Sequence, residues 1–195
     1  MRRVERRRRL LCSHLEGFFE DLVLDILRFH ELNETQINNL PLRLRIVQLW
    51  RHLDLVEKAN DQKKWAVIQS VRNSTVADET LKCEIGMFDL EIHIKDFANP
   101  GSKEVEKLFH NAGIDDIWNF VEARGSGSKI LKTSLDSLVH RRNQIAHGDA
   151  GATATPNDVK QLIIDMRRLT KVFDLVIADY LSACSTGSYP WDILV

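Results

Sequence analysis

Two long stretches of this chain carry apolar residues at spacings of three and four, and this spacing constrains the fold more than any other feature. An α-helix turns once in ~3.6 residues, so residues spaced in this way share one face, which is buried against other helices. The N-terminal stripe is formed by Leu11, Leu15, Phe18, Phe19, Leu22, Val23, Ile26 and Phe29. The C-terminal stripe is formed by Leu162, Ile163, Met166, Leu169, Phe173, Val176, Ile177 and Tyr180. We expect two long helices in an all-α bundle, and the second stripe is long enough to serve both the core and a subunit interface.

Shorter helices are predicted between these two. Pro41 opens a second helix, and residues 103–111 form a later one. Thr155 caps the last helix, with Pro156 in its first turn and Asp158 near the positive end of its dipole. The second and third helices carry the apolar residues Ile46, Leu49, Trp50, Leu53, Val56, Trp65, Ile68 and Val71. Helical spacing favours core positions for the two tryptophans in this set, although their rings can also stack on bases.

Residues 80–97 depart from helical spacing. Apolar residues alternate there with polar or small neighbours, which is the period of an extended strand. The alternating residues are Leu81, Cys83, Ile85, Met87, Leu90, Ile92 and Ile94. Two interpretations stay open for this segment: a short hairpin or extended excursion, and irregular structure within a helical domain.

Length and composition agree with one helical domain over residues 1–184. The 195 residues are 44% hydrophobic, which is enough for a core. We expect residues 1–9 to be a basic extension of the first helix and residues 185–195 to be a C-terminal tail. The aromatic cluster of the tail, Tyr189-Pro190-Trp191, either docks on a partner or packs back on the domain.

The N-terminus differs in charge from the rest of the chain. A net charge of −1 excludes a generally basic nucleic-acid binder, yet six arginines face a single glutamate within the first nine residues. Arg6 and Arg9 in this run, together with Arg141, are candidates for contacts with RNA phosphates, which would make binding salt dependent. The alternative for the N-terminal run is a solvated extension of the first helix.

The sequence shows no targeting segment and no metal-binding pattern. Charged residues interrupt the stretch after the basic start, and no window is apolar enough to span a bilayer, so we expect neither a secretory signal nor a membrane contact. The three cysteines are far apart and include no CxxC pair. We therefore expect no zinc site, no disulfide, no metal and no cofactor, in a reducing, cytoplasmic compartment.

The feature that carries chemistry is the hexapeptide Arg142-Asn143-Gln144-Ile145-Ala146-His147. A guanidinium suits a phosphate, and an imidazole, with an unperturbed pKa of ~6.5, transfers protons near neutrality. The helix around the hexapeptide has an apolar face made of Leu135, Leu138, Val139, Ile145 and Ala146. At ~100° per residue, Arg142 lies within this face, whereas Arg141 points to solvent. An inward guanidinium costs on the order of several kcal/mol unless it is paired or lines a wet cleft, so its position requires a reason.

His147 lies ~140° around the helix from Arg142, so one helix alone does not close a site. Gly148 can adopt the left-handed conformation that ends a helix, which places His147 in the last turn, where it can turn toward the arginine or toward a second subunit. His140 lies ~20° from the direction of His147 and either lines the same cleft or faces solvent. The plain alternative is that Arg142 extends from a core edge and His147 only caps the helix.

Three segments of the chain resemble one family. The string Leu138-Val139-His140-Arg141-Arg142-Asn143-Gln144-Ile145-Ala146-His147-Gly148-Asp149 resembles the signature helix of the HEPN superfamily, whose pattern is Arg, a polar residue, three more residues and His. The other two are similar to the RiboL-PSP branch of this superfamily. They are the first-helix segment 15–22, and the segment 99–109 followed by Ala112-Gly113-Ile114 as the turn, helix and glycine before the signature helix.

The resemblance implies an up-and-down helical bundle that acts as a metal-independent endoribonuclease, with an active site formed between two signature helices in a homodimer. Carried over by residue, Arg142, Asn143 and His147 are the catalytic motif, and Glu16 is a supporting acid that holds Arg142 in place. The mechanism we expect is attack by the ribose 2′-OH on its own phosphate, which leaves a 2′,3′-cyclic phosphate and a 5′-OH.

The resemblance further implies a toxin or an effector of antiviral defence, held in check by an antitoxin or another regulatory partner. The alternative function is a non-catalytic helical interaction or nucleotide-binding module. In that module Arg142 and His147 only support packing or bind a nucleotide phosphate.

Overall fold

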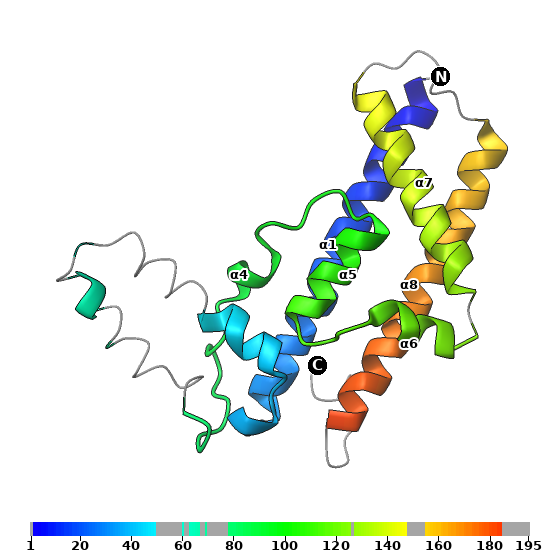
Figure 1. Ribbon diagram of the computed structural model, residues 1–195. Helices are drawn as coiled ribbons and strands as arrows, with labels where there is room; N and C mark the ends of the chain where they lie inside the picture. The colour runs from blue at the N-terminus through cyan, green and yellow to red at the C-terminus, as the bar shows by residue number, and fades with distance from the viewer. Residues whose placement is uncertain are drawn as a thin grey trace. The chain divides into compact units, whose positions relative to one another are not determined.

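The computed structural model describes residues 2–49, 60, 63–66, 69, 78–125, 127–147 and 155–184. Its helices are α1 (Arg2–Leu32), the short 3-10 helix η1 (Ile37–Asn39), α4 (Leu90–Ile94), α5 (Ser102–Asn111), α6 (Ile117–Ala123), α7 (Ser128–Ala146) and α8 (Pro156–Cys184) (Figure 1). Residues 42–49 and 63–66 are also helical. Within the described ranges there is no strand, and the isolated β-bridge joins Gln36 to Lys82. The predicted all-α fold class is confirmed.

The chain divides into two compact units, which we call unit 1 and unit 2. Unit 1 comprises Met1–Leu22, Phe97–Lys107 and Asp116–Tyr180. Unit 2 comprises Val23–Asp96, Leu108–Asp115 and Leu181–Val195. The expectation of one domain over residues 1–184 stays a prediction, and the predicted tail at 185–195 lies outside the described residues.

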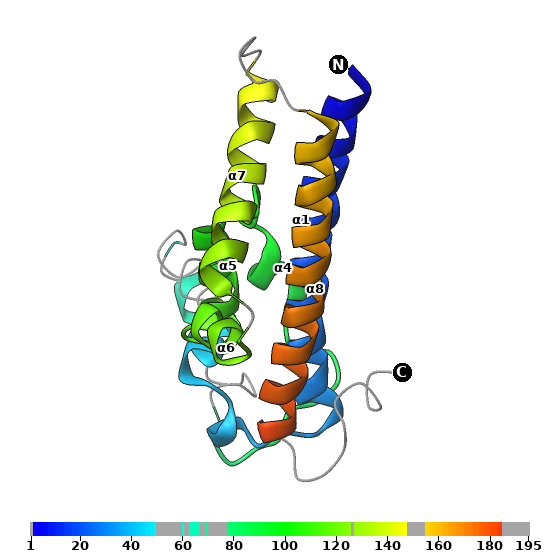
Figure 2. The same cartoon turned by 90° about the vertical axis from the view of Figure 1, so that its right-hand side faces the viewer.

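Unit 1 is built on α1, α7 and α8, whose parts in this unit lie side by side in both views (Figures 1 and 2). An aromatic cluster occupies its core. Phe19 of α1 packs edge-on against Phe97 and Phe173, with ring centroids 6.3 and 5.1 Å apart. Trp118 of α6 packs edge-on against Phe173 at 5.3 Å, and its indole N–H donates to the backbone oxygen of Ser102 at 3.0 Å. Because the indole is hydrogen-bonded, Trp118 is buried without an unsatisfied donor.

Most residues of both long stripes are buried as predicted, while Leu11, Phe18, Ile163 and Tyr180 are half-buried. The buried residues are Leu15, Phe19, Leu22, Val23, Ile26 and Phe29 on α1, and Leu162, Met166, Leu169, Phe173, Val176 and Ile177 on α8. The predicted start of α8 is also confirmed. The Thr155 hydroxyl accepts from the backbone N–H of Asp158 at 3.2 Å, and the backbone N–H of Thr155 donates to the Asp158 carboxylate at 2.9 Å. This reciprocal cap satisfies two backbone donors that a helix start leaves free.

Unit 2 has a core cluster of Leu27, Ile37, Leu40, Leu44, Cys83 and Phe88. A helix begins after Pro41 as predicted, but its buried face carries Leu44, Val47 and Gln48, while Ile46 is 37% exposed. Trp65 is 63% exposed, so its predicted core position was wrong. Further predicted stripe residues lie outside the described side chains: Trp50, Leu53, Val56, Ile68 and Val71.

The alternation in residues 80–97 does not form a hairpin. Residues 78–88 form turns, and Leu90, Ile92 and Ile94 belong to the short helix α4. Part of the backbone of this segment bonds to residues 35 and 37 in the isolated bridge, and two of its N–H groups donate to buried side chains. Glu31 accepts from the N–H of Phe88 at 3.0 Å, and Gln48 accepts from the N–H of Asp89 at 3.1 Å. Irregular structure within a helical fold was therefore the correct interpretation of the two that the sequence left open.

Gly113, in unit 2, leaves no room for a side chain. Its φ is +92°, and a Cβ atom built on it would overlap the ring of Pro41. We expect Gly113→Ala to lower the free energy of unfolding by ~2–4 kcal/mol, because it combines left-handed backbone strain with overpacking. Denaturation by urea measures this change.

Gly17→Ala is the matched control for this substitution. Gly17 lies inside α1, and a Cβ there has no neighbouring atom within 4 Å. We expect the free energy of unfolding to stay the same or to rise by up to ~1 kcal/mol, because alanine is the better helix former. Equal losses in both variants would contradict the packing of Gly113 against Pro41.

Candidate functional site

The candidate site lies on the C-terminal half of α7, in unit 1. Gly127 precedes the helix with a φ of +65°, and Leu131, Leu135 and Leu138 are buried at helical spacing. Burial then decreases along the helix, since Val139 and Ile145 are half-buried and Ala146 is exposed. The hexapeptide that begins at Arg142 is therefore on the part of α7 that leaves the core.

Two amide oxygens hold the Arg142 guanidinium. Its Nη1 donates to Oδ1 of Asn99 and to Oδ1 of Asn143, the latter at 3.0 Å. Arg142 is half-buried, as its predicted inward position requires. An Nη atom of arginine carries two hydrogens, so these two bonds use both hydrogens of Nη1, and no hydrogen bond among the described residues involves the other donors of this guanidinium.

The same helix also holds the turn that carries Asn99. Asp136 of α7 accepts from the backbone N–H and the hydroxyl of Ser102 at 2.7 and 2.8 Å, and thus caps the start of α5. Gly101 lies between, and its N–H donates to the Asn99 oxygen at 2.6 Å. Asn99 has a φ of +53°, a left-handed conformation that asparagine adopts more easily than most residues. We call residues 99–102 the capping turn.

Sequence reasoning did not assign a role to Asn99 or to Asp136. The capping turn was noted only as part of a family resemblance. One signal was present: Asn-Pro-Gly followed by Ser is typical of a turn that leads into a helix. The side chain of Asp136, which acts as the cap from a distant helix, had no local signal.

Cys12 of α1 lies beside the charged groups of the site. Burial raises the pKa of its thiol to about 11, while the positive charge of Arg142 acts to lower this pKa and the negative charge of Glu16 acts to raise it. Arg142 and Glu16 are therefore both close enough to influence one thiol. The ion pairs within the described ranges do not include one between Glu16 and Arg142, and the supporting role of Glu16 stays a prediction.

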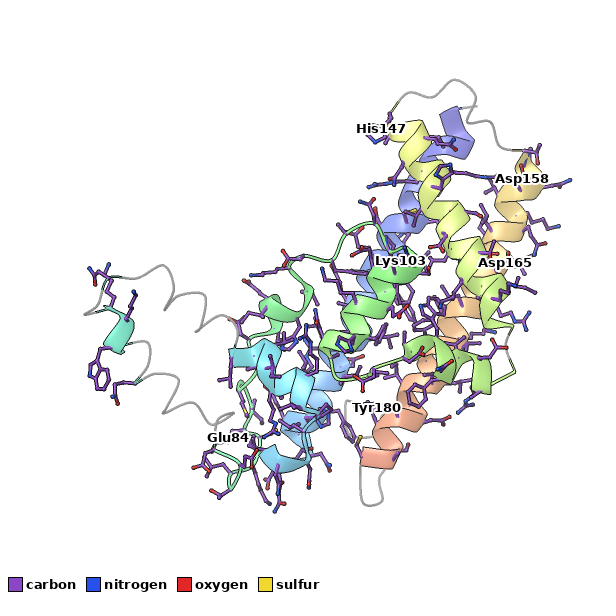
Figure 3. The ribbon with its side chains drawn as sticks, viewed as in Figure 1. Glu84, Lys103, His147, Asp158, Asp165 and Tyr180 are labelled. Atoms are coloured by element: carbon purple, nitrogen blue, oxygen red, sulfur yellow. The ribbon has the colours of Figure 1, made fainter. Side chains whose placement is uncertain are left out.

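His147 follows the last residue of α7 and is exposed (Figure 3). Its backbone N–H donates to the oxygen of Asn143 at 2.9 Å, so the helix end is held by the residue next to Arg142. The side-chain contacts of Arg142 within the described part of the chain do not include His147. The structure thus brings Arg142, Asn143 and Asn99 together, whereas the His147 side chain is exposed.

The remaining candidates lie around this centre. His140 is exposed, and Arg6 and Arg9 lie in α1 with side chains outside the described residues. Arg141 is half-buried and pairs with Asp158 at 3.7 Å, instead of standing free in solvent as expected. It lines a polar groove of about 210 Å³ together with Thr133, Ser134, Ser137, Asp158, Gln161, Leu162 and Asp165.

Two further features concern the residues that the structure describes. Within them, no three His, Cys, Asp or Glu side chains gather closely enough to bind a metal ion. None of the helices described is long and apolar enough to cross a membrane.

Comparison with known proteins gives one match. A family model described as RiboL-PSP-HEPN matches residues 10–179, which include Cys12, the capping turn, α7 and most of α8. No curated protein and no solved structure matches the chain.

Substitutions of Asn99 separate its side chain from its backbone conformation. Glycine accepts a φ of +53° without strain but provides no acceptor for Arg142, whereas alanine lacks the acceptor and is also strained. We expect Asn99→Gly to lower the free energy of unfolding by ~1 kcal/mol and Asn99→Ala to lower it by ~2–3 kcal/mol. Chemical denaturation measures both. If the two variants are as stable as the wild type, the capping turn does not hold Arg142.

Proposed function

The chain belongs to the RiboL-PSP-HEPN family, and from this premise we propose that it is a metal-independent endoribonuclease. Family membership points to an RNA-related, nuclease-like role. One observation supports the finer proposal. The Arg142 guanidinium is held in place by neutral amide oxygens, five residues before an exposed histidine at the end of the same helix.

The proposed reaction is an internal phosphoryl transfer. The ribose 2′-oxygen forms a bond to the phosphorus and loses its proton, while the bond from phosphorus to the 5′-oxygen breaks and that oxygen gains a proton. His147 moves the proton, and Arg142 stabilises the negative charge that builds on the phosphorane. The products are a 2′,3′-cyclic phosphate and a 5′-OH. DNA lacks the nucleophile and is not a substrate.

The orientation of Arg142 suits this role. Asn99 and Asn143 use both hydrogens of Nη1, and among the described residues the remaining N–H donors, on Nη2 and Nε, have no partner. These donors form the planar fork that binds two oxygens of a phosphate at once. Asn143 thus acts through Arg142, as a positioning residue within the motif.

The active site of the proposed enzyme forms between two copies of the chain. Arg142 donates a hydrogen bond to Asn99 of its own chain, whereas His147 is exposed at the helix end. A second α7 that packs against the first by a two-fold axis supplies the missing neighbour to each histidine. The enzyme we propose is a cytoplasmic toxin or antiviral-defence effector, and an antitoxin or another regulatory partner limits its activity.

A specific observation also favours a second candidate, a non-catalytic module in which Arg142 is structural. Its hydrogen bond to Asn99 links α7 to the capping turn, which is a purely structural task. Arg142→Ala therefore loses stability in both readings. His147 discriminates between them, because its exposed side chain has little to contribute to the fold.

The first test is cleavage of total cellular RNA by the wild type and by His147→Ala, both in the presence of a chelator. We expect wild-type fragments that end in a cyclic phosphate, a loss of ~100-fold or more in the variant, and equal stability within ~0.5 kcal/mol. Gel analysis and 3′-end chemistry of the fragments measure this. RNA cleavage that requires magnesium, or equal cleavage by the wild type and His147→Ala, contradicts the proposal.

A mixing experiment tests the shared site. Arg142→Ala and His147→Ala are each expected to be inactive, and a refolded mixture is expected to recover roughly a quarter of the wild-type activity. Half of the dimers in such a mixture contain one chain of each variant. Each of these mixed dimers has two sites, of which one combines an intact arginine with an intact histidine and the other lacks both. No recovery, in a mixture that forms dimers, contradicts a site built from two chains.

A further inference from the structure

We propose that the exposed face of α8 from Lys160 to Lys171 binds the phosphate backbone of RNA. The proposal rests on the function proposed above for its substrate class, and it adds the surface that holds that substrate outside the reacting centre. We call this face the α8 basic stripe. Its cations are Lys160, Arg167, Arg168 and Lys171, all of them exposed.

The four cations lie on one side of the helix. At ~100° per residue, they fall within an arc of ~100°, and Ile164 and Leu175 lie in the same arc. From Lys160 to Lys171 the helix rises ~17 Å. Phosphates follow one another at ~3.4 Å of rise along one strand of a duplex, so the α8 basic stripe faces several phosphates of a bound strand.

The carboxylates in this part of α8 are turned toward α7. Asp158 pairs with Arg141 at 3.7 Å, and Asp165 accepts from the Ser134 hydroxyl at 2.9 Å. Gln161 adds a second hydrogen bond to Asp165 at 2.9 Å. Figure 3 labels both carboxylates on the helix. The acidic side chains are thus engaged along one flank of α8, and the basic side chains remain on the other.

The cations of the stripe are not neutralised within the part of the chain that the structure describes. None of the ion pairs among those residues includes Lys160, Arg167, Arg168 or Lys171. The next carboxylate along the helix is Asp174, three residues beyond Lys171, and the ion pairs of the described residues do not join the two. A row of unpaired cations on a rigid helix is complementary in charge to a phosphodiester backbone.

Two other occupants fit the stripe less well. A second copy placed on the same face by a two-fold axis would oppose four cations with four identical cations, which is unfavourable. An anionic membrane surface would attract the charges, but binding of a helix to the interface also needs a broad apolar face. The α8 basic stripe offers only two aliphatic side chains, Ile164 at 49% and Leu175 at 47% exposure.

The stripe lies in the same unit as the candidate site. Arg141, the neighbour of Arg142, pairs with Asp158 in the first turn of α8, so the start of α8 lies beside the last turns of α7. Figure 2 shows the two helices running side by side from this end. A strand bound along the stripe therefore starts near the helix end that carries His147.

Binding is tested with a labelled single-stranded 2′-O-methyl oligonucleotide, which the proposed chemistry is unable to cleave. The variant carries Arg167→Gln, Arg168→Gln and Lys171→Gln, since glutamine keeps helix propensity and removes charge. For single strands, log K falls with log salt by ~0.7 for each phosphate contact. Fluorescence anisotropy at several salt concentrations should therefore give a slope that is smaller by ~2 in the variant than in the wild type.

A matched control removes the same charge elsewhere on the surface. It carries Lys95→Gln, Lys103→Gln and Lys107→Gln, three exposed lysines outside α8. We expect this variant to keep the wild-type slope. Equal slopes in all three proteins overturn the proposal, and so does binding to phosphatidylserine vesicles without binding to the oligonucleotide.

The outcome for the nuclease is read separately. A wild type that binds the oligonucleotide through the stripe but leaves unmodified RNA intact supports the binding surface and contradicts the proposed reaction. If the wild type cleaves RNA but its binding has the same salt dependence as that of the glutamine variant, the result supports the reaction and contradicts RNA binding by the α8 basic stripe.

Discussion

The hydrogen bonds between α7 and the capping turn are the contacts on which the candidate site depends. They fix Arg142 at a point where the helix has already left the core, beyond Leu138. The acceptors of the guanidinium among the described residues are two amide oxygens, which orient a cation without cancelling its charge. A carboxylate in their place would form a charge-assisted pair and compete with a phosphate for the same donors. The amide oxygens of Asn99 and Asn143 therefore fix the position of the guanidinium without neutralising it.

Periodicity and helix signals predicted much of this arrangement, because they act locally. The stripes of α1 and α8, the cap at Thr155 and the half-buried position of Arg142 all follow from residues within a few turns of one another. The hydrogen bond from Arg142 to Asn99 could not be predicted in this way. Asn99 and Arg142 are 43 positions apart, and only the tertiary fold brings an asparagine in a left-handed conformation to a guanidinium. Arg141 shows the same limit, since its partner Asp158 lies on another helix.

The sequence-based predictions were less accurate for unit 2, because its interior contains polar groups. His30 and His93 are buried, and burial lowers the pKa of each imidazole to about 4, so both are neutral near neutrality. Glu31 and Gln48 are buried as well and accept backbone hydrogen bonds from residues 88 and 89. The backbone of residues 81–89 is held partly by these side chains and partly by the isolated bridge to residues 35–37, and the alternating residues there form turns and a short helix. Local polarity was therefore a poor guide to exposure in this unit.

The distribution of charge makes the proposed binding of RNA compatible with a net charge of −1. A phosphate responds to the local electrostatic potential at the surface, whereas the net charge is a sum over the whole chain. On α8 the carboxylates of Asp158 and Asp165 are engaged by α7, and on α7 the guanidinium of Arg142 is held by uncharged acceptors. Cys12 adds no anion, because burial keeps its thiol protonated with a pKa of about 11, even beside a positive charge. Hydrogen bonds between helices thus concentrate positive charge on unit 1 without any excess of basic residues in the chain.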